Sequence, residues 1–271
     1  MYDFLHPDRV VIGVESDRAK ELLLELYKPL QAPVIVTDVK SAELIKHASN
    51  SFLATKISFI NSVADLCELV GADVELVAEG MGLDRRIGRA FLNAGLGFGG
   101  FCFPKDLQAF VKIAEKCGHD FRLLREVDRI NQARIPQMIR KLRDQLWILK
   151  DKVIGVWGLS FKPDTDDVRY SPAIALIKQL LTEGAVVRAY DPKAMEKARE
   201  ALPSLVCCQN PYEVASGADA LVVTTEWREF ESLDLMQVKG MMQRPLILDG
   251  RNLFDREKMR SMGFEYLGVG R

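Results

Sequence analysis

Apolar residues recur at helical spacing over about thirty consecutive positions, from Val39 to Leu69. This pattern predicts one helix far longer than the mean of about eleven residues. Asp38 or Ser41 can cap its start, and Gly71 can close its end. A helix of this length usually forms the spine of a domain or of a dimer. We therefore expect a two-fold homodimer built on it.

The pattern differs on the two sides of this helix. Before it, a predicted helix from Asp17 to Leu30 lies between two short strands, which is too little for a domain. After it, helices are expected up to about Leu149, interrupted by one glycine-rich loop. From Lys152 the chain reads as a doubly wound α/β unit whose last predicted strand is Leu246–Asp249. The expected fold class is α/β, with a remnant of a parallel sheet at 1–38, a central helical dimerisation domain at 39–150 and a Rossmann-like domain at 151–271.

Composition excludes several classes of protein. The formal net charge is −1 over 271 residues, which gives no electrostatic reason to expect nucleic acid or an anionic membrane as partner. No apolar run approaches the roughly 18–20 residues that span a bilayer. The five cysteines show no metal or disulfide spacing, and the three histidines are widely separated. These features predict a cytoplasmic protein without a metal site.

Cys102 lies in the segment Gly-Phe-Gly-Gly-Phe-Cys-Phe-Pro-Lys-Asp-Leu, which runs from Gly97 to Leu107. The glycines allow a sharp turn and a close approach to a ligand. Pro104 suits the first turn of a helix. The positive end of that helix and the nearby Lys105 favour the thiolate of Cys102, which is the nucleophilic form. This cysteine is predicted to be a nucleophile rather than an inert buried thiol.

The segment from Gly95 to Asp106 resembles the cysteine motif of the UDP-glucose 6-dehydrogenase family. The resemblance implies NAD as cofactor and the oxidation of UDP-glucose to UDP-glucuronate in two steps, through a thiohemiacetal and a thioester on Cys102. Dehydrogenases of UDP-N-acetylmannosamine usually carry a histidine before the cysteine and lack the Phe-Pro-Lys run. The motif therefore favours UDP-glucose, while UDP-N-acetylmannosamine and GDP-mannose stay open as alternatives.

Further residues match family motifs. Lys46 and Asn50 lie at i and i+4 on the long helix, so their side chains share one face. By the resemblance they position the sugar and stabilise negative charge on the reacting oxygen. The resemblance also implies that Asp106 supports the catalytic water and orients Lys46. The resemblance implies substrate contacts by Arg86 from a partner subunit, by Phe91, Leu92, Asn93, Ala94 and Gly95 over the sugar and uridine, and by Gly99, Phe161, Lys162 and Arg251. It places Cys102, Lys105 and Arg169 toward NAD.

The first turn of the C-terminal α/β unit departs from a dinucleotide fingerprint. It reads Gly155-Val-Trp-Gly158, and Trp157 stands where a small residue should admit a pyrophosphate. Asp191 alone is weak support for a ribose site, so we expect no standard NAD site there. The family's N-terminal NAD-binding domain is matched only by its end, which predicts a shortened chain with weak UDP-sugar binding and little turnover. A nucleotide-sugar-binding dimerisation module without catalysis is the alternative of another class.

Overall fold

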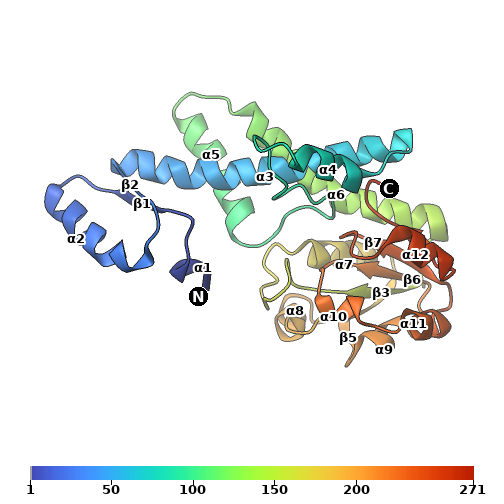
Figure 1. The fold of residues 1–271 in the computed structure, drawn as a ribbon. Coiled ribbons are helices and arrows are strands. Elements are labelled where there is room, and N and C mark those ends of the chain that lie inside the picture. Colours follow the sequence, from blue (N-terminus) through green and yellow to red (C-terminus); the bar gives the residue numbers. More distant parts are fainter. Residues whose placement is uncertain (1) are drawn as a thin grey trace. The chain divides into compact units, whose positions relative to one another are not determined.

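The computed structural model describes residues 2–271, with side chains from Phe4 onward. The chain divides into two compact units, Met1–Phe52 and Leu53–Arg271. Figure 1 labels their elements. The domain boundaries at residues 38 and 150 stay a prediction. In the described part of the chain, no helix is both long and apolar enough to span a membrane.

The first unit holds a two-stranded parallel sheet. Strand β1 (Val10–Gly13) pairs with β2 (Val34–Thr37), and α2 (Asp17–Tyr27) with the short 3-10 helix η1 (Lys28–Leu30) connects them. A further short helix, α1 (Tyr2–Leu5), precedes β1. Asp38 caps the next helix, because its carboxylate accepts a 2.9 Å hydrogen bond from the backbone N–H of Ser41. The predicted strand–helix–strand order is therefore confirmed.

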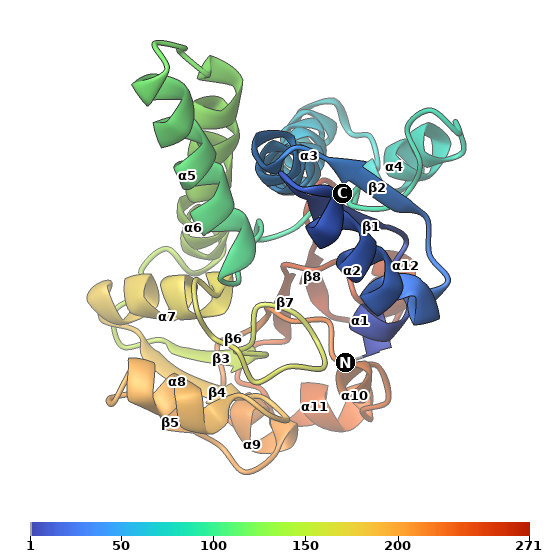
Figure 2. The ribbon, with the colours of Figure 1, turned by 90° about the vertical axis from the view of Figure 1, so that its left-hand side faces the viewer.

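Four helices form the middle of the chain. The long helix α3 (Val39–Val70) has 32 residues, in agreement with the expected spine. It is followed by α4 (Val74–Gly82), α5 (Cys102–Lys116) and α6 (Arg122–Leu146). Helices α5 and α6 pack side by side as an antiparallel pair (Figures 1 and 2). The sequence predicts the start of this helix at Lys105. Helix α5 begins three residues earlier, so Cys102 is its first residue.

A six-stranded parallel sheet forms the C-terminal part, in the order β5-β4-β3-β6-β7-β8. Its strands are β3 (Val153–Trp157), β4 (Val186–Tyr190), β5 (Val206–Cys207), β6 (Ala220–Val223), β7 (Leu246–Asp249) and β8 (Glu265–Leu267). The expectation that β7 is the last strand is wrong, because β8 adds an edge strand of three residues. A strand this short leaves little periodicity in the sequence to indicate it. The order reverses between β3 and β6, and ligands of such sheets bind beyond the carboxyl ends of strands at this point.

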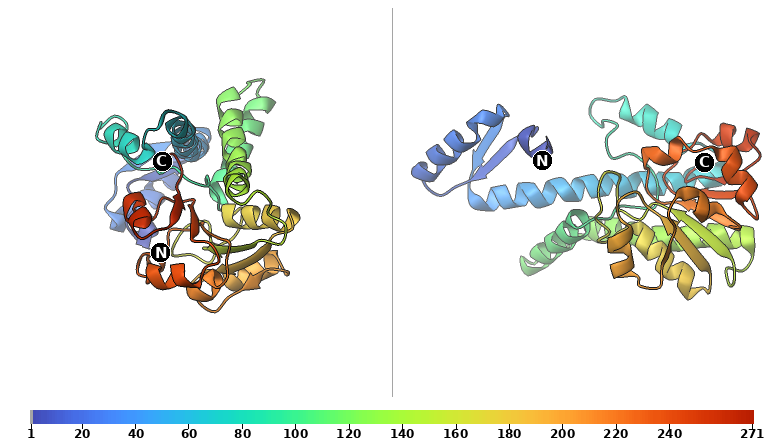
Figure 3. Two further views of the ribbon diagram at one scale, coloured as in Figure 1. Left: turned by 90° about the vertical axis from the view of Figure 1, so that its right-hand side faces the viewer. Right: turned by 90° about the horizontal axis from the view of Figure 1, so that it is seen from below.

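Helices cover both faces of this sheet (Figure 3). Ile154 and Val156 of β3 pack in one core with α7 (Pro172–Thr182), α8 (Met195–Ala201) and α6. Trp157 faces a second core on the other side. That core is built on α9 (Pro211–Ala215), α10 (Arg228–Glu231), α11 (Leu235–Met241) and α12 (Arg256–Ser261). Burial on both faces explains the continuous apolar runs of the strands.

Candidate functional site

A groove of about 600 Å³ in the second unit carries the exposed thiol of Cys102. Its walls come from the loop before α5, the loop after β3 and the loop after β7. It brings together residues that the sequence predicted from distant segments, namely Phe91, Asn93, Gly99, Cys102, Phe161, Lys162, Arg169 and Arg251. Aromatic side chains and three cationic side chains, Lys162, Arg169 and Arg251, share this groove with two carboxylates, Asp167 and Glu226, which pair with Arg169 and Arg251. Such a lining suits a ligand that has a flat ring and negative charge.

Two glycines allow the cysteine loop to approach the loop after β3. Gly100 has φ +77°, and a Cβ at this position would lie 2.8 Å from the ring of Phe161. Gly99 packs on the carbonyl of Tyr170 so closely that a Cβ would collide with it. The backbone N–H of Gly100 also donates to the carbonyl of Arg169, at 3.1 Å. The sharp turn predicted from these glycines therefore joins the nucleophile to the loop that carries Phe161 and Arg169.

Asp167 orients Arg169 at the rim of the groove. Its two carboxylate oxygens accept hydrogen bonds from Nε and Nη2 of Arg169, at 3.0 and 2.7 Å. These hydrogen bonds lower the pKa of Asp167 and raise that of Arg169. The guanidinium lies 4.6 Å from the ring centre of Phe101, and Nζ of Lys105 lies 4.9 Å from the same ring. Two cations thus stack on the aromatic residue next to Cys102.

Arg251 is held in the groove by the turn after β7. Asp249 is fully buried and accepts hydrogen bonds from the backbone N–H of Arg251 and from the hydroxyl of Tyr266. The Nε of Arg251 donates to the carbonyl of Thr224 at 2.9 Å and lies 3.3 Å from a carboxylate oxygen of Glu226. Burial is the largest influence on Asp249 and raises its pKa. The guanidinium end stays partly exposed, so it can meet a ligand oxygen.

The segment from Phe91 to Gly95 presents alternate side chains to the groove. Phe91 and Asn93 line it, whereas the side chains of Leu92 and Ala94 are buried in the core. Gly95 packs on the carbonyl of Gly250, where a Cβ would lie only 2.6 Å away. Any ligand contact by Leu92, Ala94 or Gly95 is therefore made by backbone atoms.

Three further predicted site residues of the second unit, Arg86, Lys105 and Asp106, do not line the groove. Asp106 is 3% exposed, with a carboxylate oxygen 3.5 Å from Nζ of Lys105. The side chain of Arg86 is 89% exposed and pairs with Asp84. Sequence reasoning assigned Arg86 to a site on a neighbouring subunit, and that assignment stays a prediction.

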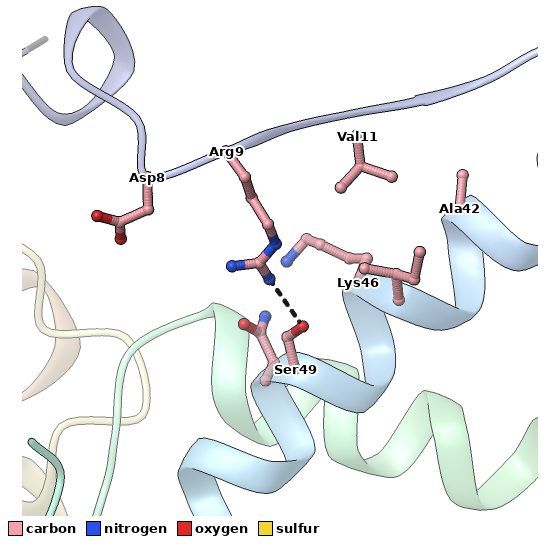
Figure 4. A pocket seen from close by; sticks show the side chains of 8 residues that line it. Asp8, Arg9, Val11, Ala42, Lys46 and Ser49 are labelled. Carbon is pink, nitrogen blue, oxygen red and sulfur yellow. Dashed lines mark hydrogen bonds between the residues drawn. The ribbon is translucent and has the colours of Figure 1, made fainter. Parts of the chain in front are cut away.

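Lys46 and Asn50 belong to the first unit, where they line a second cavity of about 390 Å³ (Figure 4). Both line it together with Val11 of β1, and their i,i+4 spacing predicts that they share one face of α3. Arg9 lies beside them, and its Nη2 donates a 3.1 Å hydrogen bond to Ser49. The cavity therefore gathers two cationic side chains and an amide. Joint action of this pair with Cys102 stays a prediction.

Two strand-to-helix turns, the one after β1 and the one after β3, do not fit a dinucleotide pyrophosphate. The turn after β1 carries Glu15 and Asp17, whose negative charge opposes a pyrophosphate at the start of α2. After β3, Trp157 is fully buried and donates to the carbonyl of Pro211. Both oxygens of Asp191 are engaged by backbone N–H groups, such as those of Leu159 and Ala194. The carboxylate of Asp191 therefore binds the backbone of the adjacent loops, and neither of its oxygens is available to a ribose hydroxyl.

Sequence reasoning missed Asp167, Arg89 and Glu226, which contact predicted groove residues; Asp167 and Glu226 also line the groove. Asp167 lies two positions before Arg169 in the sequence. This spacing is typical of an aspartate whose side chain bonds within its own turn, and it could have indicated the pair. Arg89 holds the groove residue Asn93 through a 2.6 Å hydrogen bond. Glu226 carries no motif that could have indicated its place beside Arg251. Among residues 2–271, no group of histidine, cysteine or carboxylate side chains is arranged to hold a metal ion.

Comparison with known proteins identifies the family. The profile "UDP-glucose/GDP-mannose dehydrogenase family, central domain" matches residues 40–133, and the profile "UDP-glucose/GDP-mannose dehydrogenase family, UDP binding domain" matches residues 155–256. The chain belongs to the UDP-glucose/GDP-mannose dehydrogenase family. The family resemblance inferred from the cysteine motif is thereby confirmed.

Named relatives agree with this membership. The chain is 48% identical to UDP-glucose 6-dehydrogenase of Rhizobium meliloti (strain 1021), over 99% of this chain and 63% of the relative. It is 45% identical to UDP-glucose 6-dehydrogenase YwqF of Bacillus subtilis (strain 168), over 100% of this chain and 62% of the relative. Its fold matches a UDP-glucose dehydrogenase from Pyrobaculum islandicum with a TM-score of 0.91 and 40% identity, over 99% of this chain and 60% of that one. The chain thus spans about three fifths of the length of these relatives.

Proposed function

We propose that this chain carries the substrate groove and the nucleophile of an NAD-dependent UDP-glucose 6-dehydrogenase that acts in the cytoplasm. The observation that carries the proposal is the single groove that gathers Cys102 with Phe161, Lys162 and Arg251. These residues come from three segments that are far apart in the sequence. The cationic side chains suit the diphosphate of a nucleotide sugar, and the aromatic lining suits its uracil ring.

Cys102 supplies covalent catalysis in this proposal. Its thiolate attacks the carbon of a C6 aldehyde, and a carbon–sulfur bond forms as the carbonyl oxygen takes up negative charge. NAD would supply the oxidant twice: one molecule would accept a hydride from the C6 alcohol, which gives the aldehyde, and a second would accept a hydride from the thiohemiacetal, which gives the thioester. Water then attacks the thioester, which releases the carboxylate and returns the thiol. Lys46 and Asn50 stabilise the oxyanion, and Asp106 supports the water, as the family resemblance implies.

NAD is the proposed cofactor, with Arg169, which lines the groove, and Lys105, on the same aromatic ring, as the cations nearest to it. Both stack on Phe101, next to the reacting thiol. The two turns tested above do not fit a pyrophosphate. This mismatch favours the second candidate, a nucleotide-sugar-binding module that does not catalyse hydride transfer by itself.

UDP-glucose is the proposed substrate, because the sequence identity to UDP-glucose 6-dehydrogenases is higher than that to a dehydrogenase of another sugar nucleotide. The relatives named UDP-glucose 6-dehydrogenase are 43–48% identical to this chain. A UDP-D-ManNAc dehydrogenase from Pyrococcus horikoshii is 28% identical, with a TM-score of 0.85. The Phe-Cys-Phe-Pro-Lys run around Cys102 agrees with the former group.

A two-fold dimer is also proposed. Large apolar side chains on and after the helices α3 and α4 face outward, among them Leu69 (84% exposed), Leu76 (69%) and Leu83 (78%). Exposed apolar side chains of this size are candidates for burial against a second copy. Arg86 lies close in sequence to Leu83 and is exposed, so a partner subunit can receive it.

Titration calorimetry with UDP-glucose, GDP-mannose and UDP-N-acetylmannosamine tests the proposed function. UDP-glucose should bind in the micromolar to millimolar range, and GDP-mannose should bind more weakly. Addition of NAD and measurement of reduced cofactor separates the enzyme from the binding module. Equal affinity for the UDP- and GDP-sugars would contradict the proposed substrate.

A further inference from the structure

The turn Gly95–Phe98 connects the groove residue Asn93 to the loop of Cys102, and it contains no regular secondary structure. Its residues are buried, so each backbone N–H and C=O group needs a partner inside the protein. Most of these partners are side chains that project from the two long helices α3 and α6.

Gly95 is bound on both sides of its backbone. Its N–H donates to Oδ1 of Asn61 on α3 at 2.8 Å, and its carbonyl accepts from Nε of Arg134 on α6 at 3.1 Å. The side chain of Arg134 is 1% exposed, and its Nη1 donates to Asp65 at 2.5 Å. A buried charge is costly unless it is paired in this way. Arg134 thus binds the turn while its charge is compensated by α3.

Asn131 binds Phe98 in the same two-sided manner. Its Oδ1 accepts from the N–H of Phe98 at 2.8 Å, and its Nδ2 donates to the carbonyl of Phe98 at 3.1 Å. Gly97, between the two bound residues, has φ +94°, and a Cβ there would collide with Oδ1 of Asn131. Asn131 and Arg134 lie at i and i+3, so one face of α6 presents both to the turn.

We propose that Asn131, with Arg134 and Asn61, is a positioning residue for the groove. These side chains fix the backbone from Gly95 to Phe98 and thereby set where Asn93 and Cys102 stand relative to a bound ligand. None of the three residues lines the groove itself. The inference rests on the proposed function for its consequence, because the bound ligand is taken to be a uridine nucleotide.

Hydrogen exchange and UDP binding test this inference on the chain as it is. Asn131→Leu removes both hydrogen bonds to Phe98, and Asn131→Asp keeps the acceptor but removes the donor. Exchange of the peptide spanning residues 93–103 should rise by about fivefold in Asn131→Asp, which loses one hydrogen bond, and by more in Asn131→Leu, which loses two. The dissociation constant for UDP should rise by a similar factor and in the same order.

Ser58→Ala is the matched control. It removes a buried 2.9 Å hydrogen bond from Ser58 of α3 to the carbonyl of Val127 on α6 without touching the turn. A general loss of stability would raise the exchange of residues 93–103 in Ser58→Ala as well as in the Asn131 variants. A positioning role raises it in the Asn131 variants alone. If Asn131→Leu does not fold, Asn131→Asp gives the same comparison.

Unchanged exchange and unchanged UDP affinity in folded Asn131 variants would overturn the inference. So would equal changes in Ser58→Ala. Failure of the unaltered chain to bind UDP would contradict the proposed function, and the exchange rates would still decide whether Asn131 fixes the turn.

Discussion

Cys102 and Cys117 stand at the two ends of the same helix. Cys102 is the first residue of α5, and Cys117 caps its C-terminus by donating its backbone N–H to the last turn. Both cysteines are exposed, so they share solvent access and differ in the sign of the helix dipole that they meet. The peptide dipoles favour negative charge at Cys102 and oppose it at Cys117. Cys117 can therefore serve as an internal reference for the reactivity of the Cys102 thiol.

We predict that iodoacetamide alkylates Cys102 about fivefold faster than Cys117 at neutral pH, the size expected from opposite ends of a helix dipole. Mass spectrometry of the two cysteine-containing peptides over time measures both rates in one sample. Cys102→Ser should leave the rate at Cys117 unchanged. Equal rates at the two cysteines would show that Cys102 is not activated by its position.

Arg251 is predicted to be the main anchor for a nucleotide diphosphate. Arg251→Ala should weaken UDP binding about tenfold or more, since a charge-assisted hydrogen bond contributes about 1.5–3 kcal/mol. The UDP affinity of Arg251→Lys should lie between those of the unaltered chain and Arg251→Ala, because lysine keeps the charge and loses the planar guanidinium group. Arg129→Ala, at a 76% exposed side chain on α6, is the control. Calorimetry that finds equal affinity in Arg251→Ala and Arg129→Ala would refute this role.

The pair of Asp167 and Arg169 predicts a pH dependence of stability. Hydrogen bonds from Arg169 lower the pKa of Asp167 below its ordinary value of 3.8. A lowered carboxyl pKa means that the pair stabilises the fold above that value and that this stabilisation is lost as the pH falls through the folded-state pKa. Asp167→Asn should therefore reduce the free energy of unfolding at pH 7, by less than about 1 kcal/mol because solvent screens an exposed pair.

Urea unfolding of Asp167→Asn and the unaltered chain at several pH values measures this effect. The difference between the two chains should shrink as the pH is lowered toward and below 3.8. A difference that is constant or grows toward acid pH would contradict the ion-pair explanation.

The outward-facing leucines of α3 and α4 predict a dimer at micromolar concentration. Leu69→Glu combined with Leu76→Glu should shift the chain to a monomer, because a buried, unpaired carboxylate opposes association. Trp147→Ser, at an 86% exposed residue after α6, is the control and should stay dimeric. Light scattering distinguishes the states, and a monomer for the unaltered chain would remove the basis for Arg86 acting across an interface.

The fold was largely predictable because its strongest signals are local. The helical spacing of apolar residues along α3, the apolar runs of the strands and the capping residue Asp38 each act within a few positions of the chain. The short edge strand β8 was missed, since three residues cannot show a period. The sequence places the start of α5 too late, at Lys105, because Pro104 is a clearer signal of a first helical turn than the glycine-rich turn that precedes it.

The candidate site divides in the same way. Residues that carry chemistry, such as Cys102 and Arg251, stand in motifs and were found from them. Residues that hold those groups in place were not found, because the partners of Asn131 and Arg134 lie 33 and 39 positions away and are polar groups of the backbone, which any sequence supplies. Only the fold brings them together.

The last prediction concerns turnover. Hydride transfer requires the nicotinamide to be held about 3–3.5 Å from the reacting carbon, and this positioning contributes several kcal/mol. The turn after β1 opposes a pyrophosphate through Glu15 and Asp17, and the turn after β3 is closed by Trp157 and Asp191. The purified chain with UDP-glucose and NAD should therefore bind the sugar nucleotide yet form reduced cofactor far more slowly than about 1 per second, which is the low end for ordinary enzymes. Absorbance of the reduced cofactor measures the rate, with Cys102→Ser as the blank. Turnover at an ordinary rate would show that residues other than these two turns hold the dinucleotide well enough for catalysis.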